Sequence, residues 1–202
     1  MISRGLIKRI TCACVTFACL AVVSFAARCG VVRSVSEETG LVNWHFTGNG
    51  FEVELVQRLP DQTRGFFLAR GFPPEVADEI ATSCIFQTIV RNSGTSTHPV
   101  SVDLVQWRLL HADGEGGVRL KEAWMDSWPV DKVSQASRLA FRWATFPTQQ
   151  EFLPGDYNWG MTAFGLAPGG VFDLNVVWQE GGQARSGWIR GVECAPDVDR
   201  LQ

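Results

Sequence analysis

Hydrophobic and polar residues alternate along several stretches of the chain, and this period of two predicts β-strands with one buried face. The clearest stretches are residues 42–46 and 51–55, where Val, Trp, Phe and Leu alternate with Asn, His and Glu. The sequence Gly48-Asn49-Gly50 lies between them and supplies residues that suit a tight turn. We therefore predict a β-hairpin over residues 42–55.

A helical spacing follows Pro73 and Pro74. Proline is tolerated in the first helical turn, and the acidic Glu75 and Asp78 suit the positive N-terminal end of a helix. The apolar residues recur three and four positions apart: Val76, Ala77, Ile80 and Ala81. This pattern predicts one short helix over about residues 74–83, with its apolar face packed on a sheet.

β-branched and aromatic residues return from Ile85 onward, and turn-forming residues divide the remaining chain into strands. The expected strands begin at Ile85 and continue over residues 100–110, 118–123, 139–144, 157–164, 172–178 and 186–194. Residues 124–133 are expected to be irregular. Trp44, Trp143 and Trp178 occupy inward positions of their strands, so we expect all three in the core.

Strands separated by frequent turns, with a single helix, predict an all-β sandwich or small barrel. The stretch Leu153-Pro154-Gly155-Asp156-Tyr157 resembles the turn before a late strand in secreted immunoglobulin-like domains. This resemblance concerns the fold alone and implies an immunoglobulin-like β-sandwich of roughly 8–10 strands with one short inserted helix. It also implies that the Tyr157 hydroxyl bonds back to the backbone at this corner.

The beginning of the chain has the pattern of an export signal. Three positive residues precede an uncharged apolar run over residues 10–27, and small residues before Ala27 suit signal peptidase. Two interpretations are open: residues 1–26 are a cleaved signal peptide, or this N-terminal hydrophobic helix stays as an anchor in the inner membrane. Both place the chain from residue 30 outside the cytoplasm, as a periplasmic, secreted or tethered protein.

The remainder is long enough for a single domain, which we assign to residues 30–196 with a frayed tail at 197–202. The full chain has a net charge of −3, and the domain is more acidic still because the leader carries positive charges. Acidity without a basic cluster argues against nucleic acid or an anionic membrane surface as the main partner.

Three cysteines lie beyond the leader: Cys29, Cys84 and Cys194. Thiols tend to pair outside the cytoplasm, and we expect a disulfide between Cys84 and Cys194. A bond between Cys29 and Cys194 and a buried free thiol are the alternatives, and the odd count leaves one cysteine over. Cys84 follows the C-terminal end of the predicted helix, where the helix dipole disfavours the thiolate that a nucleophile needs.

Histidine and methionine supply the remaining candidates for a metal site. The side chains of the right type for copper are His98, His111, Met125 and Met161. They show no ligand spacing within one element, and Cys194 is not followed by the His and Met of a blue-copper site. We therefore expect no cofactor and keep copper handling in the periplasm as an alternative function.

The irregular segment at 124–129 is the expected binding surface, because it carries Trp124, Met125 and Trp128. The opposing interpretation is that the segment folds back and caps one end of the sandwich. No nucleophile elbow or phosphate-binding loop occurs in the chain. The sequence thus predicts an exported, non-catalytic binding or accessory domain that contacts a protein partner, with a carbohydrate-binding module as a second alternative.

Overall fold

The structure is a computed structural model that describes residues 30–95 and 97–198. The predicted signal peptide or anchor, the possible tether at residues 10–27 and Cys29 lie outside the described residues. Within the described ranges, no helix combines the length and hydropathy that a membrane span requires.

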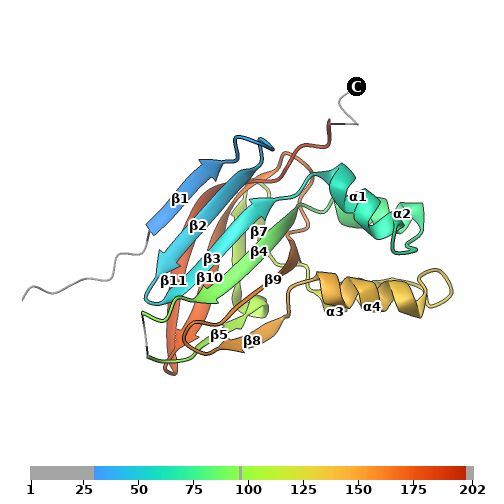
Figure 1. The fold of residues 1–202 in the computed structure, drawn as a ribbon. Helices are drawn as coiled ribbons and strands as arrows, with labels where there is room; N and C mark the ends of the chain where they lie inside the picture. The colour runs from blue at the N-terminus through green and yellow to red at the C-terminus, as the bar shows by residue number, and fades with distance from the viewer. Residues whose placement is uncertain (1–29, 96, 199–202) are drawn as a thin grey trace, which may run out of the picture.

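Two antiparallel β-sheets make up most of the described chain (Figure 1). The first sheet has the strand order β1-β2-β3-β4-β9. Its strands are β1 (Gly30–Val35), β2 (Val42–Gly48), β3 (Phe51–Gln57), β4 (Ile85–Asn92) and β9 (Tyr157–Ala163). The predicted hairpin is confirmed, because β2 and β3 pair from Asn43 opposite Val56 to Gly48 opposite Phe51. Asn49 and Gly50 both have positive φ angles, as a two-residue hairpin turn requires.

The second sheet is built around one long strand. Its strands are β5 (Val100–Asp103), β6 (Arg108–His111), β7 (Gly114–Gly117), β8 (Gln149–Phe152), β10 (Val171–Glu180) and β11 (Gln183–Glu193). Strand β10 pairs with β11 along one edge, while β6 and β5 share its other edge. The 3₁₀ helix η1 (Leu104–Gln106) separates β5 from β6, so the strand predicted over 100–110 is interrupted.

Aromatic side chains fill the space between the two sheets and define the fold as a β-sandwich. The ring of Phe51 stacks on Trp178 with centroids 4.6 Å apart, and Phe46 meets the same indole edge-on at 5.7 Å. Trp44 and Trp178 are buried, as their inward positions predicted. The all-β sandwich class is therefore correct.

In the described part of the chain, four α-helices extend from one end of the sandwich (Figure 1). They are α1 (Pro60–Leu68), α2 (Pro74–Ala81), α3 (Lys121–Ser127) and α4 (Gln135–Ala144). Their inner faces form a second apolar core, which we call the helical cluster. Its members are Phe67, Phe72, Val76, Ala77, Ile80, Ile85, Trp124, Trp128, Val133, Phe141, Met161 and Ala163. The predicted helix matches α2, but the expectation of a single helix is wrong.

The strand predicted over 139–144 is helix α4 instead. Ser134 caps this helix by accepting a hydrogen bond from the Ser137 backbone N–H at 3.1 Å. Because successive side chains on a helix are 100° apart, Phe141 points inward while Trp143 points outward and is 81% exposed. The strand predicted over 118–123 and the irregular segment over 124–133 are likewise wrong where α3 replaces them.

The turn at 153–157 is present, but Tyr157 does not close it. The Asp156 carboxylate accepts a hydrogen bond from the Leu153 backbone N–H at 3.0 Å and holds the turn. Tyr157 opens β9 with its side chain 58% exposed, and its ring centroid lies 4.8 Å from the Arg91 guanidinium carbon. The tyrosine therefore points outward, against the role that the resemblance implied.

Candidate functional site

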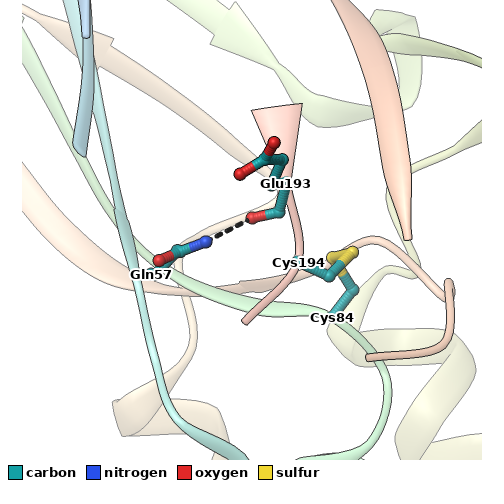
Figure 2. Close-up of a disulfide and its surroundings, with 4 residues drawn as sticks. All are labelled: Gln57, Cys84, Glu193 and Cys194. Atoms are coloured by element: carbon teal, nitrogen blue, oxygen red, sulfur yellow. Dashed lines mark hydrogen bonds between the residues drawn. A yellow bond between two sulfur atoms is a disulfide. The ribbon is translucent and has the colours of Figure 1, made fainter. Parts of the chain in front are cut away.

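Cys84 and Cys194 form a disulfide bond, the pairing that the sequence favoured (Figure 2). Cys84 directly precedes β4 of the first sheet, and Cys194 directly follows β11 of the second. Their Cα atoms are 5.0 Å apart although 110 positions separate them in the sequence. The bond thus links the two sheets at one point, and such long-range disulfides are typical of proteins that fold in an oxidising compartment.

A buried glutamine makes a second link between the sheets beside the disulfide (Figure 2). The Gln57 side chain donates to the Glu193 backbone carbonyl at 2.8 Å and accepts from the Val42 backbone N–H at 3.0 Å. Both bonded cysteines are almost fully buried. Their sulfurs therefore have a structural role and are not available as a nucleophile or as metal ligands.

The binding surface predicted at Trp124, Met125 and Trp128 is contradicted by burial. Trp124 and Trp128 are only 1% and 5% exposed, inside the helical cluster, and Met125 is half-buried against it. Arg138 closes the segment by donating to the backbone carbonyls of Met125 and Trp128, each at 2.7 Å. The segment folds back because its tryptophans find apolar partners beneath the helices, so it cannot present them to a protein or a sugar.

The four candidate copper ligands come from separate parts of the fold. Met125 and Met161 pack in or against the helical cluster, whereas His111 ends β6 in the second sheet and His98 precedes β5. Among residues 30–95 and 97–198, no group of three or more His, Cys, Asp or Glu side chains could hold a metal ion. The arrangement gives no support to a copper site.

Two exposed tryptophans mark a different surface. Trp143 on α4 and Trp159 on β9 are 81% and 60% exposed. Both line two neighbouring hollows of about 480 and 340 Å³, which we together call the tryptophan groove. The larger hollow also contacts Phe66 and Met161. Large exposed aromatic side chains that share one concave surface are a feature of binding sites.

The backbone brings α4 and β9 together at this groove. Phe146 follows α4 and donates its N–H to the Met161 carbonyl at 2.9 Å. Gly160 lies directly beneath, since a Cβ atom there would be only 2.5 Å from the Phe146 nitrogen. The missing side chain lets the end of α4 approach β9, which places the indoles of Trp143 and Trp159 on one surface.

The groove is lined by cations and by no carboxylate among the described residues. Arg58 and Arg70 line the larger hollow, and Lys121 and Arg142 line the smaller one. This local charge is opposite to the net charge of −3 of the whole chain. Burial without an acidic partner lowers the pKa of Arg58, and its Nε is buried with no hydrogen-bond partner.

Sequence reasoning missed this groove for a specific reason. It placed Trp143 in a strand facing the core and gave Trp159 no role. The N-cap signal was nevertheless present, because Ser134 precedes a run of good helix formers at 135–140. A helix from residue 135 would have put Phe141 and Trp143 on opposite sides.

Comparisons of this chain with protein-family models, with curated proteins and with solved structures gave no match. The function is therefore inferred from the geometry and chemistry of the groove.

Proposed function

We propose that the chain is an exported, non-catalytic binding domain that contacts a protein partner outside the cytoplasm through the tryptophan groove. The observation that carries this proposal is the exposure of Trp143 and Trp159 around shared hollows. Tryptophan is enriched among the residues that dominate binding energy at protein interfaces. The leader pattern at residues 1–26 and the disulfide support the location.

The groove is built from elements that are already packed, which favours binding. Met161 in its floor belongs to the helical cluster, and Phe141 anchors α4 in that cluster two residues before Trp143. A partner would thus meet a preformed surface, so association costs little conformational entropy on the side of this protein.

The charged lining supports binding over catalysis. General acid–base chemistry needs a group that titrates near neutral pH, whereas arginine and lysine stay protonated there. No Asp, Glu, His or Cys lines either hollow in the described part of the chain. The immunoglobulin-like assignment stays a fold-level prediction and adds nothing to this function.

Site-specific photo-crosslinking in the cells that make the protein tests the proposal. A benzophenone amino acid replaces Trp143 or Trp159 in the full chain, and Trp188 on β11 serves as the matched control because it is a partly exposed tryptophan in the other sheet. We expect one discrete protein adduct from positions 143 and 159 and none from 188. Equal crosslinking at all three positions, or none in the groove, would contradict the proposal.

A further inference from the structure

The lining of the larger hollow has many more hydrogen-bond donors than acceptors. Arg58 and Arg70 contribute guanidinium groups, which only donate, and Gln87 is the one lining side chain with an oxygen acceptor among the described residues. A surface rich in hydrogen-bond donors favours a ligand that carries hydrogen-bond acceptors. Neutral sugars need acceptors for their hydroxyl groups as well, so this lining suits an anion better.

Arg58 has an unused bonding capacity. It directly follows β3, and its backbone N–H donates to the Ile85 carbonyl at 3.2 Å, which fixes where the side chain starts. Within the described residues, neither an ion pair nor a hydrogen bond holds its guanidinium, and the buried Nε has no partner. By contrast, Arg64 on α1 is surrounded by the carboxylates of Asp61, Asp78 and Asp197. An unpaired, partly buried cation is costly for the fold, so a bound carboxylate would relieve it.

Arg70 is held in place beside the same hollow. Its guanidinium carbon lies 3.3 Å from the centroid of the Phe66 ring, and its Nη1 donates to the Phe66 carbonyl at 2.8 Å. Stacking and hydrogen bonding restrain the side chain while other N–H groups keep their bonding capacity. The hollow thus combines a restrained cation with an unpaired one.

The apolar walls of the larger hollow have a shape and composition that suit apolar side chains of a partner protein. Phe66, Met161, Ala140 and Ala144 contribute aliphatic and aromatic surface beside the two indoles. A sugar stacks on flat aromatic faces, whereas methionine and alanine walls favour an irregular apolar side chain.

We propose that the tryptophan groove binds an acidic segment of a partner protein, with a carboxylate at Arg58 and Arg70 and a neighbouring apolar side chain against Phe66, Met161 and Trp159. This inference rests on the proposed binding function and specifies the chemistry of the partner. Lys121 and Arg142 in the adjoining hollow extend the positive surface beyond Trp143 for a second acidic residue. Negatively charged carboxylates on the partner would complement the positively charged lining. Their oxygen atoms would also accept hydrogen bonds from the lining's many donors.

Selection from a phage-displayed library of random heptapeptides tests this inference. The full chain, purified as the cell processes it, is the bait, and the W143A/W159A double variant is the counter-bait. The most enriched peptide is then titrated calorimetrically into wild type, Arg58→Gln and the matched control Arg108→Gln. Arg108 lies on β6 and donates to the carbonyls of Val105 and Trp107, so its loss removes the same charge at a position outside the groove's lining.

We expect the selected peptides to be rich in Asp and Glu next to an apolar residue. R58Q should weaken binding about ten-fold or more, since a hydrogen bond to a charged group is lost, while R108Q should change it by less than about two-fold. Replacing the peptide's carboxylates by amides should have an effect similar to that of R58Q. Circular dichroism and thermal melting verify that each variant is folded.

The contradicting outcomes are distinct. Selected peptides without acidic residues, still lost with W143A/W159A, would overturn the acidic inference and leave the proposed binding function standing. No enrichment over the counter-bait would overturn both. Binding of polygalacturonate that depends on Arg58, without acidic peptides, would replace the protein partner by an acidic glycan.

Discussion

Gly160 has no side chain at the point where the chain after α4 lies against β9. A methyl group there would meet the backbone of Phe146 at 2.5–2.6 Å, and backbone atoms cannot move aside as a flexible side chain can. We expect Gly160→Ala to lower the free energy of unfolding by about 1–3 kcal/mol and to displace Trp143 from Trp159. Urea unfolding measures the loss. Gly116→Ala is the control, because its nearest neighbour would be 3.8 Å away, and an equal loss there would contradict the explanation.

Arg58 shows a conflict between stability and binding at the level of a single residue. Burial lowers its pKa, but an arginine stays charged at every accessible pH, so a change in pH cannot relieve the cost of the unpaired cation. We expect Arg58→Met to raise the urea midpoint and to weaken binding of an acidic peptide. A lower midpoint would show that Arg58 is held by the fold and is not kept for a ligand.

The elements divide into those that the sequence reveals and those that it does not. Strands β2, β3 and β10 keep strict alternation over their length, and α2 has both its proline start and its helical spacing. In α4, three apolar residues at i, i+2 and i+4 imitate a strand, although only Phe141 is inward. Helix α1 also begins with a proline, Pro60, and has Asp61 in its first turn, but Gly65 in its middle interrupts the run of helix-forming residues. Tertiary packing in the helical cluster therefore decides what the local pattern leaves open.

The N-cap of α4 tests this explanation at the scale of the element. Ser134 accepts from the Ser137 N–H and also contacts the Ser137 hydroxyl at 2.8 Å, and Ser137 itself is buried against the carbonyls of Arg70 and Gly71. We expect Ser134→Ala to destabilise the protein by about 1 kcal/mol and to increase amide exchange in the first turn of α4. The control is Ser186→Ala on the exposed side of β11. If exchange in α4 is unchanged, the cap does not define this helix.

For the molecule as a whole, residue type and compartment could predict the disulfide, whereas the groove depends on how several elements meet. Cys84 and Cys194 are two of only three cysteines that follow the leader, so few pairings were available. The groove residues Arg58, Phe66, Trp143 and Trp159 come from different elements and share no spacing in sequence. The tryptophan groove exists because one side of α4 faces the helical cluster and the opposite side carries Trp143. Only the packed fold specifies this orientation of α4.

The disulfide closes a long loop between the sheets, and its removal tests how much the sandwich relies on it. We expect the Cys84→Ala/Cys194→Ala double variant to lose about 2–4 kcal/mol of unfolding free energy, chiefly because the unfolded chain gains freedom. Urea unfolding with and without reductant measures this loss, and reductant should have no further effect on the variant. Equal stability of both proteins would show that Gln57 and the aromatic core suffice to hold the sheets together.

If the proposed function is correct, a protein partner covers the tryptophan groove in the cell. Hydroxyl-radical footprinting measures this most directly, by comparing tryptophan oxidation in the purified protein with oxidation in intact producing cells. We predict that Trp143 and Trp159 react strongly in the purified protein, as their exposure requires, and are protected in cells, while Trp188 reacts equally in both. Equal oxidation of Trp143 and Trp159 in cells and in the purified protein would contradict the account.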